Sequence, residues 1–440
     1  MKTVKRLAAL LIAGLFAVTL LAGCGEKKEP APAGSGSSSA PVAAGGTIKI
    51  GYVNPTTGAL AGNGEGCDWV VKQIEDYVNG NGGIEVDGAK KNIKVIVYDS
   101  TSDQQTAADM AQKLCVEDEV DLIIAIQTPE TAIPVEAQAE INEVPCIGIQ
   151  APVDPCAMAS DTHDWTVHAF WTIDNIYEAH KALWTAAGFG PGSGAKIGLA
   201  FANDADGTAW HDTFVVKLAA DGYQVVDPGQ YPSLTDDFSN VVKAFKDADI
   251  DILAGTNIPP DFSNLFTQMQ AQGVSVDAIT MGKCCLLPGD VAALGDNVQG
   301  ILSEVWWSPL YPYVSGLTGV DCATLGASYL ADNGGVMPQP AGYAYAALEL
   351  AVQAFQKAGT TDKAKVMEAI RGLDVETIVG PIKYDKEMNG LQYSDTVVAG
   401  GQWQKNEAGE WELVVIDASL YPELKDAVTG AYKPGNATQK

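Results

Sequence analysis

The sequence predicts an α/β protein made of two lobes, each built on a doubly wound parallel sheet. Three observations predict this fold class. Short, almost wholly apolar segments alternate with longer segments whose apolar residues recur at helical spacing. The alternation restarts after Phe170, which indicates a second unit of the same kind. Strands that are apolar on both faces belong to a parallel sheet that helices cover on each side.

The first unit opens with an apolar strand at residues 48–53, which ends in a polar, glycine-rich loop. Helical spacing of Val70, Ile74 and Val78 predicts the helix that follows, and the run Asn-Gly-Asn-Gly-Gly at 79–83 ends it. The remaining elements expected in this unit are a strand at 93–98, a helix at 106–115, a strand at 120–126, a helix at 131–141 and a strand at 145–149.

The second unit repeats this order without a detectable sequence repeat. Its expected helices are 174–187, 208–220, 237–246 and 261–272, and its expected strands are 196–201, 223–226, 251–254 and 277–281. Two further helices are expected at 341–358 and 361–371. The tail differs, because 396–403 and 411–416, joined by Asn-Glu-Ala-Gly, predict an antiparallel hairpin.

The N-terminus predicts a bacterial lipoprotein. Lys2, Lys5 and Arg6 precede an apolar run that ends in Leu-Ala-Gly-Cys at residues 21–24, so 1–23 are read as a signal peptide. Cys24 would carry the lipid, and two or more acyl chains give stable anchoring. Residues 24–46 are rich in Gly, Ser, Ala and Pro and predict a flexible tether, with the functional body starting near Thr47.

Charge and hydropathy exclude two classes of partner. The 55 acidic residues outnumber 27 basic ones and give a formal net charge of −28. Such a surface repels phosphate backbones and anionic lipid, so nucleic-acid binding is not expected. No second long apolar run follows the signal, so the lipid is the only expected contact with the membrane.

The cysteine pattern predicts neither a zinc site nor a thioredoxin-like site, because there is no Cys-x-x-Cys pair. Of eight cysteines, Cys24 would be consumed by lipid, and the odd number left cannot all pair within the chain. Cys67, Cys115 and Cys146 are read as small buried hydrophobic residues. The sequence assigns no role to the adjacent residues Cys284 and Cys285.

Ligands of open parallel sheets bind where strands end and helices begin. The loops expected to form such a site are 54–66, 127–131, 150–154, 203–207 and 257–261.

Several short motifs follow one another along the chain: IKIGYVNPTTGALAG at 48–62, VNGNGGI at 78–84, YDS at 98–100, FAND at 201–204 with Gly207, DFS at 237–239, and GPI at 380–382 with Tyr384 and Asp385. Together they resemble the branched-chain amino-acid (Leu/Ile/Val)-binding proteins of ABC transporters. The resemblance covers residues 47–416 and implies the type I periplasmic-binding fold.

The resemblance also implies that the chain passes between the lobes three times, near Phe170, Gly300 and Val379. One lobe would hold 47–170 and 300–378, and the other 171–299 and 379–440. Closure of the lobes would enclose a small molecule and present a new surface to a permease.

Site residues follow from the resemblance one at a time. The loop at 127–131 should offer a hydroxyl and backbone N–H groups to a ligand carboxylate, with Thr131 better placed than Thr128 and Glu130 between them. An N-cap role for the same hydroxyl is the alternative. Gln150 and Ala151 are expected to line the next loop, although Pro152, which has no N–H, departs from the family pattern.

Charged and aromatic candidates complete the predicted site. Asp261 stands where amino-acid binders place an acidic partner for the ligand ammonium, but an Asp at a helix start also serves as a cap. Asp206 occupies a position where many relatives carry Tyr. Trp306 and Trp307 offer large aromatic faces suited to apolar or ring-bearing ligands.

The sequence therefore predicts a receptor that binds an amino acid or similar small carboxylate and delivers it to an ABC import permease. It is expected to act as a monomer without cofactor, metal or catalytic residues. A lipid-anchored module that feeds a separate sensor is the alternative. An enzyme is disfavoured, because no Gly-x-Ser-x-Gly or His-Glu-x-x-His motif occurs and none of the four histidines adjoins a credible nucleophile.

Overall fold

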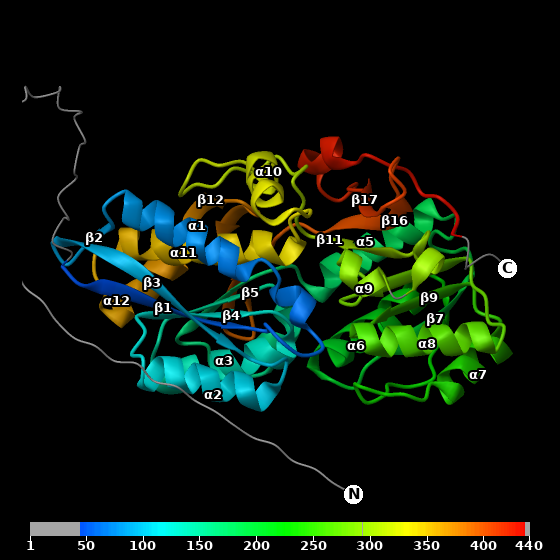
Figure 1. The fold of residues 1–440 in the computed structure, drawn as a ribbon. Helices are drawn as coiled ribbons and strands as arrows, with labels where there is room; N and C mark the ends of the chain where they lie inside the picture. The colour runs from blue at the N-terminus through cyan, green and yellow to red at the C-terminus, as the bar shows by residue number, and fades with distance from the viewer. Residues whose placement is uncertain (1–44, 293, 436–440) are drawn as a thin grey trace, which may run out of the picture. The chain divides into compact units, whose positions relative to one another are not determined.

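Buried strands alternate with helices in the structure, a computed structural model that describes residues 45–292 and 294–435 (Figure 1). Eight strands form one sheet in the order β14-β15-β6-β5-β4-β1-β3-β2. Their bounds are β1 Thr47–Asn54, β2 Ile84–Val86, β3 Ala89–Asp99, β4 Leu122–Ile126, β5 Cys146–Ile149, β6 Thr166–Ala169, β14 Lys386–Met388 and β15 Leu391–Ser394. The strands from β15 to β3 are parallel, and β2 and β14 pair antiparallel at the two edges. We call this sheet and its helices the first lobe.

Helices cover both faces of the first sheet because successive residues of its central strands, which point to opposite faces, are apolar. Leu122 and Ile124 of β4 join one hydrophobic cluster with α1, whereas Ile123 joins another with α2. The covering helices are α1 Cys67–Gly80 and α11 Gln339–Ala358 on one face, and α2 Gln104–Val116 and α3 Pro129–Asn142 on the other. The lobe also contains η1 Ala61–Gly64, α4 Val153–Met158, α10 Cys322–Asn333, α12 Lys363–Arg371 and a two-stranded sheet of β12 Asp374–Thr377 and β13 Gly380–Lys383.

The second lobe is built on a seven-stranded sheet in the order β17-β16-β11-β10-β9-β7-β8. Its strands are β7 Lys196–Phe201, β8 Gln224–Val226, β9 Ile252–Thr256, β10 Ala278–Gly282, β11 Leu302–Val305, β16 Ala399–Lys405 and β17 Trp411–Asp417. Its helices are α5 Ile173–Ala186, α6 Ala205–Ala220, α7 Ser239–Ala248, α8 Pro259–Ala271 and α9 Pro288–Ala292, with η2 Gly295–Val298 and η3 Pro422–Ala427. Leu199 of β7 packs in the cluster that contains α5 and α6, and its neighbour Ala200 packs in the cluster that contains α7 and α8.

The predicted fold class is confirmed, and every strand and helix expected within residues 48–416 is present. The sequence interpretation missed β2, β6, α4, α9, the helix α10 and the two short hairpins β12–β13 and β14–β15. Apart from α10, which has 12 residues, these elements are short, so none of them gives a long periodic pattern. The predicted antiparallel hairpin at the end of the chain is β16–β17.

Two of the three predicted crossings lie elsewhere in the chain. The first passes from β6 to α5 over residues 170–172, as expected. The second follows β11, which pairs with β10 and β16, so the chain leaves the second sheet after Val305 and not near Gly300. The third follows β15, which pairs with β6, so it lies between Ser394 and Ala399 and not at Val379. Strand pairing therefore moves residues 300–305 to the second sheet and residues 386–394 to the first.

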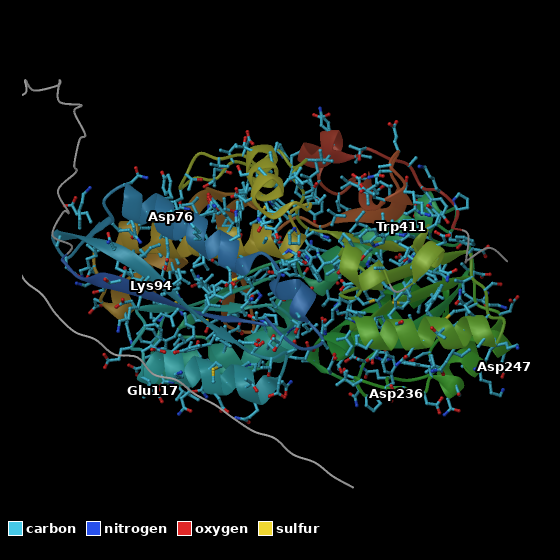
Figure 2. The ribbon with its side chains drawn as sticks, in the orientation of Figure 1. Asp76, Lys94, Glu117, Asp236, Asp247 and Trp411 are labelled. Carbon is cyan, nitrogen blue, oxygen red and sulfur yellow. The ribbon has the colours of Figure 1, made fainter. Side chains whose placement is uncertain are left out.

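Acidic side chains lie on the outside of both lobes, and Figure 2 labels Asp76, Glu117, Asp236 and Asp247 among them. The seven described cysteines are buried and free, which confirms that Cys67, Cys115 and Cys146 are core residues. Within the described residues, no helix combines the length and the apolar character that a membrane-crossing segment needs.

Candidate functional site

A cleft lies at the carboxyl ends of the central strands of both sheets. Side chains from the two lobes and from the crossing segments line it: Asn63, Gln127, Thr128, Gln150, Pro152, Phe170, Trp171, Asp206, Trp210, Thr256, Lys283, Leu286, Glu304 and Trp306. It contains about 370 Å³ of space between the protein atoms, part of it open to solvent. The cleft is of a size for a small molecule.

Three of these residues have an unusual backbone conformation. Gln127, Gln150 and Lys283 have φ values of 65°, 60° and 66°, and each comes directly after a central parallel strand, β4, β5 or β10. Left-handed φ values are uncommon for residues with a Cβ atom, and they concentrate at binding sites. The strain turns each chain sharply at the strand end, so that these side chains line the cleft.

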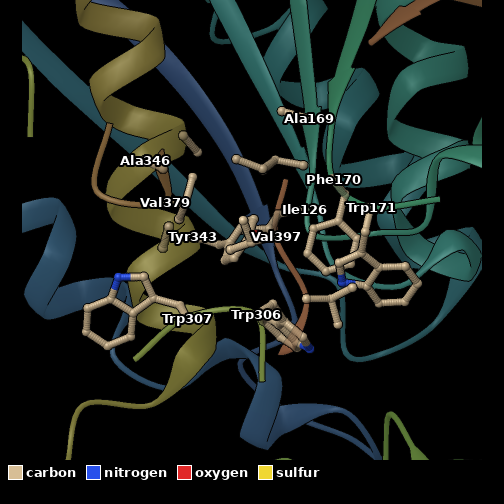
Figure 3. Close-up of a cluster of buried hydrophobic side chains, with 14 of the residues drawn as sticks. Ile126, Ala169, Phe170, Trp171, Trp306, Trp307, Tyr343, Ala346, Val379 and Val397 are labelled. Atoms are coloured by element: carbon tan, nitrogen blue, oxygen red, sulfur yellow. The ribbon is translucent and has the colours of Figure 1, made fainter. Parts of the chain in front are cut away.

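Aromatic rings form one wall of the cleft. The ring centroid of Phe170 lies 4.5 Å from that of Trp171 and 5.5 Å from that of Trp306. The ring centroids of Trp171 and Trp210 are 5.9 Å apart. Figure 3 shows Phe170, Trp171 and Trp306 together, with Trp307 pointing away from them. Trp307 donates its Nε1–H to the Ile378 carbonyl at 3.1 Å and does not line the cleft.

Six buried polar atoms of the cleft have no hydrogen-bond partner among the described residues. They are Gln127 Oε1, Thr128 Oγ1, Gln150 Oε1, Trp171 Nε1, Thr256 Oγ1 and Trp306 Nε1. A buried polar group without a partner costs about 1–3 kcal/mol, so such atoms are rare in folded chains. Their convergence from both lobes indicates a site that a ligand with several polar groups completes.

A buried ion-pair cluster joins the lobes beside the aromatic wall. Lys283 Nζ of the second lobe lies 3.1 Å from Glu130 Oε2 of the first lobe and 3.2 Å from Asp206 Oδ2. The backbone N–H of Asp206 also donates to Glu130 Oε1 at 3.1 Å, and Trp210 Nε1–H donates to Asp206 Oδ1 at 2.9 Å. These contacts hold the two lobes together across the cleft.

Burial and charge shift the pKa values of this cluster. Burial alone would lower the pKa of Lys283, but the charges of Glu130, Asp206 and Asp204 raise it above its usual range. Burial raises the pKa of Asp206 to about 7, with Lys283 opposing the shift and the charges of Glu130 and Asp204 adding to it. One lysine thus faces more carboxylate groups than it can neutralise.

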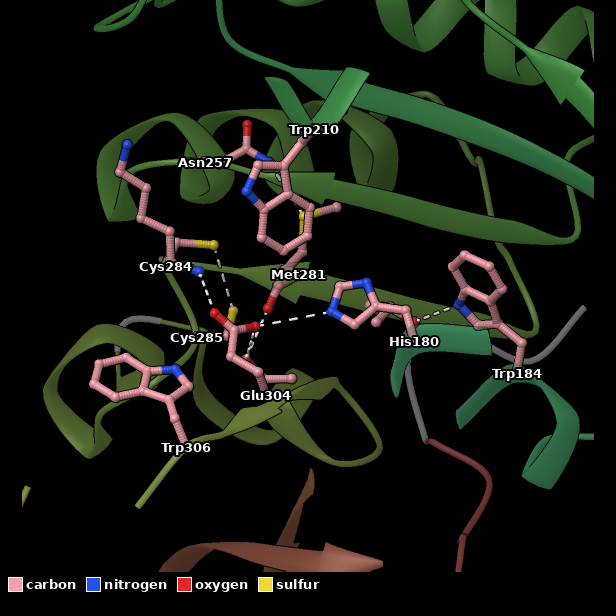
Figure 4. Close-up of polar contacts among 12 residues, drawn as sticks. His180, Trp184, Trp210, Asn257, Met281, Cys284, Cys285, Glu304 and Trp306 are labelled. Atoms are coloured by element: carbon pink, nitrogen blue, oxygen red, sulfur yellow. Dashed lines mark hydrogen bonds and ion pairs between the residues drawn. The ribbon is translucent and has the colours of Figure 1, made fainter. Parts of the chain in front are cut away.

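Glu304 adds a further carboxylate to the same side of the cleft. Its Oε1 accepts from the Lys283 backbone N–H at 3.1 Å, and its Oε2 lies 3.8 Å from His180 Nε2 (Figure 4). Cys284 and Cys285 lie beside it with their sulfur atoms 3.6 Å apart. The charged groups that line the cleft are therefore Asp206, Glu304 and Lys283, with an excess of negative charge.

The structure brings four of the predicted site residues into the cleft: Thr128, Gln150, Asp206 and Trp306. Glu130 contacts it through Lys283. Thr128 lines the cleft and Thr131 does not, and the Thr131 hydroxyl donates to the Gln127 carbonyl at 2.8 Å. Thr128 is the N-cap residue of α3, yet its hydroxyl caps no backbone N–H.

The other predicted residues lie outside the cleft lining. The Ala151 carbonyl accepts from His168 Nε2 at 2.7 Å. Asp261 is the third residue of α8 and does not cap that helix; its Oδ2 accepts from the backbone N–H of Leu234 at 3.1 Å, and burial raises its pKa to about 6. Cys24 lies outside the described residues.

Sequence reasoning missed Lys283, Thr256 and Glu304. Lys283 follows a predicted apolar strand at 277–281, so the strand-end rule that selected the other loops could have found it. Trp210 is only 1% exposed and packs in the core, but it also lines the cleft.

A profile described as "Periplasmic binding protein" matches residues 47–406 of the chain. No curated protein sequence matches it.

Solved structures with a similar fold include a leucine-binding protein, LivK, from Thermotoga maritima, at 19% identity and a TM-score of 0.68, covering 83% of this chain and 97% of that one. LivJ from Streptococcus pneumoniae, a branched-chain amino-acid transporter substrate-binding protein in complex with isoleucine, has 18% identity and a TM-score of 0.66, covering 84% and 100%. A solute-binding protein of an ABC transporter from Rhodopseudomonas palustris, in complex with 3,4-dihydroxybenzoic acid, has 21% identity and a TM-score of 0.64, covering 84% and 96%.

Proposed function

The chain belongs to the periplasmic binding protein family, and from this we propose that it is an extracytoplasmic receptor that captures a small carboxylate between its lobes and delivers it to an ABC import permease. The observation that carries the proposal is the set of six unpartnered polar atoms that converge on one cleft from both lobes. A catalytic role has no support, since the family is one of binding proteins.

Among small carboxylates, an amino acid fits the charges of the cleft better than an anion without an amine. Lys283 is already paired with Glu130 and Asp206, so a ligand carboxylate finds no free cation among the cleft residues. The unpartnered Trp171 and Trp306 N–H groups and the Thr128 and Thr256 hydroxyls can donate to that carboxylate as neutral groups. A ligand ammonium would offset the excess charge of Asp206 and Glu304 and could lie against the aromatic wall.

Anchoring and assembly belong to the same proposal. Lipid on Cys24 would hold the receptor at the membrane through the tether at 24–46, and one chain would suffice for binding because both walls of the cleft come from the same chain. No part of the proposal needs a cofactor.

Native mass spectrometry of the purified protein tests the receptor assignment. We expect one retained small molecule per chain, and calorimetry with isoleucine, phenylalanine and 3,4-dihydroxybenzoate should show tighter binding of an amino acid than of the benzoate. Conversion of the retained compound to a product, or no retained mass and no binding of any probe, would reject the assignment. Tighter binding of the benzoate would leave the receptor role intact and reject the amino-acid preference.

A further inference from the structure

Three buried side chains with different metal-binding atoms meet behind the cleft loop that contains Gln150. They are Glu136 on α3, Cys156 on α4 and His168 on β6. A carboxylate oxygen, a thiol sulfur and an imidazole nitrogen from these residues all lie within 4.8 Å of one another. The residues are 5%, 0% and 0% exposed.

The hydrogen bonds of His168 leave two acceptor atoms facing each other at this point. Its Nε2 lies 2.7 Å from the Ala151 carbonyl, which can only accept, so Nε2 carries the hydrogen. In the neutral ring, Nδ1 is then an acceptor, and it faces Glu136 Oε1, another acceptor, at 3.1 Å. Two acceptors approach this closely when a proton or a metal ion lies between them.

The hydrogen bond from His168 Nε2 to the Ala151 carbonyl is a contact typical of metal-binding histidines. A ligating imidazole usually donates its other N–H to a carbonyl or carboxylate, which fixes the ring. Two ligands of a tetrahedral zinc ion, each about 2.0 to 2.2 Å from it, lie roughly 3.3 Å apart, close to the separation of Nδ1 and Oε1. The geometry of His168 and Glu136 thus fits a shared metal ion.

Gly148 on β5 leaves room for these two groups. A Cβ atom at this position would lie 2.3 Å from both Glu136 Oε1 and His168 Nδ1, so any other residue would displace them.

We propose that Glu136, Cys156 and His168 form a structural zinc site behind the ligand cleft. Mixed sulfur, nitrogen and oxygen ligands suit zinc, and with three protein ligands a water molecule would take the fourth position. The ion would tie α3, α4 and β6 together and, through His168 and Ala151, hold the loop on which Gln150 faces the cleft. This departs from the sequence expectation of no metal, because the ligands are spread over 136–168 without a short motif.

Metal analysis of the full chain tests the site without reference to the transported ligand. The protein is purified without a polyhistidine tag, treated with a chelator, equilibrated with zinc and dialysed, and zinc is measured by mass spectrometry. We expect one zinc ion per chain in the wild type and in the control Cys115→Ser, which replaces another buried free cysteine of the first lobe. Cys156→Ser and His168→Gln should bind zinc at least about 10-fold more weakly.

X-ray absorption of the zinc-loaded wild type decides the matter even if a variant fails to fold. A zinc spectrum with sulfur and imidazole ligands supports the site. No zinc retained by the wild type, equal zinc in Cys156→Ser, or a spectrum with oxygen ligands alone would overturn it and leave a proton between His168 and Glu136.

Discussion

Lys283 Nζ lies 3.1 Å from Glu130 Oε2, although the lysine follows β10 of the second lobe and the glutamate belongs to α3 of the first. Both side chains are largely shielded from solvent, with 8% and 16% of the lysine and glutamate side chains exposed. The pair connects the two lobes at the cleft without a ligand between them. We therefore expect it to favour the closed arrangement of the lobes by itself.

Removing the lysine should favour the open arrangement of the lobes. Lys283→Met leaves Glu130 and Asp206 buried close together without their cation, at a cost of about 3–5 kcal/mol in the closed state. We expect a lower melting temperature and a larger radius of gyration by small-angle scattering. Lys405→Met is the control, because Lys405 pairs with Asp296 on the surface and such pairs contribute less than about 1 kcal/mol. Equal effects of the two variants would contradict this role of Lys283.

The neighbouring tryptophans should separate binding from stability. Trp306 lines the cleft with an unpartnered Nε1, so Trp306→Phe should weaken ligand binding by about tenfold, the loss of one hydrogen bond to a charged group, with little change in melting temperature. Trp307 is 1% exposed and bonds to the Ile378 carbonyl, so Trp307→Phe should lower the melting temperature and spare the affinity. Calorimetry and thermal unfolding of both variants check this, and the reverse pattern would mean that Trp307 contacts the ligand.

Asp206, and not Asp261, should respond to the ligand amine. Asp206→Asn should weaken binding of an amino acid by more than about tenfold, since loss of a buried charge partner costs about 2–5 kcal/mol, and should weaken binding of the matching acid without the amine much less. Asp261→Asn keeps an oxygen that can accept from Leu234 and should leave both affinities unchanged. Selective loss of amino-acid binding in Asp261→Asn would support the original assignment of that residue, which stays a prediction until then.

Glu349 should make the fold less stable at alkaline pH. It lies on α11, wholly buried, and burial raises its pKa to about 7, while its Oε2 accepts from the Ile378 N–H at 2.9 Å. Because the folded-state pKa lies above the unfolded one, the folded chain holds more protons between these values, and this stability is lost as pH rises through about 7. Glu349→Gln lacks this titration, so its free energy of unfolding relative to wild type should increase by on the order of 3 kcal/mol from pH 5 to pH 8.

Thermal unfolding across this pH range measures the effect of Glu349. The exposed turn variant Glu407→Gln serves as control and should follow the wild-type curve. Parallel curves for Glu349→Gln and wild type would show that Glu349 is charged in the folded chain at pH 5 as well.

Cys24→Ser tests the anchor. The variant should accumulate as an unprocessed or released protein without lipid, because Cys24 is the residue that we propose to be acylated, while its thermal unfolding stays that of the wild-type body. Fractionation of membranes and mass spectrometry of the N-terminus report the outcome. Normal processing and retention at the membrane would be incompatible with a lipoprotein.

Strand and helix order could be read from the sequence because each central strand is apolar on both faces, as β4 and β9 are. The edge of the first sheet could not be read from the sequence in this way. β14 and β15 are short and half exposed, and their only strong signal is Asn389-Gly390, whose positive φ values of 46° and 82° form the tight hairpin turn. That dipeptide predicts a hairpin but not the sheet it joins, and the third crossing was misplaced for this reason.

The sequence could predict which strand ends form the cleft, but not which of the cleft residues contact one another. Thr128 and Gln150 follow directly from the strand-end rule. The contact of Glu130 with Lys283 could not follow, because the two residues are 153 positions apart and lie on different lobes. Asp261 is a different case, since its position in the chain suggests a ligand contact, whereas in the structure its carboxylate accepts from the backbone N–H of Leu234, at a φ of 64°.

Phe170, Trp171 and Trp306 all lie on the segments where the chain passes from one sheet to the other. A change in the angle between the sheets must therefore turn these rings relative to the loops that bear Thr128 and Gln150. A compound stacked on the rings resists that rotation directly, so the lifetime of the complex should follow the size and fit of the ligand's flat or apolar part more than its number of hydrogen bonds. Selectivity in such a receptor would then be expressed in how slowly the right compound leaves, and not in how fast it enters.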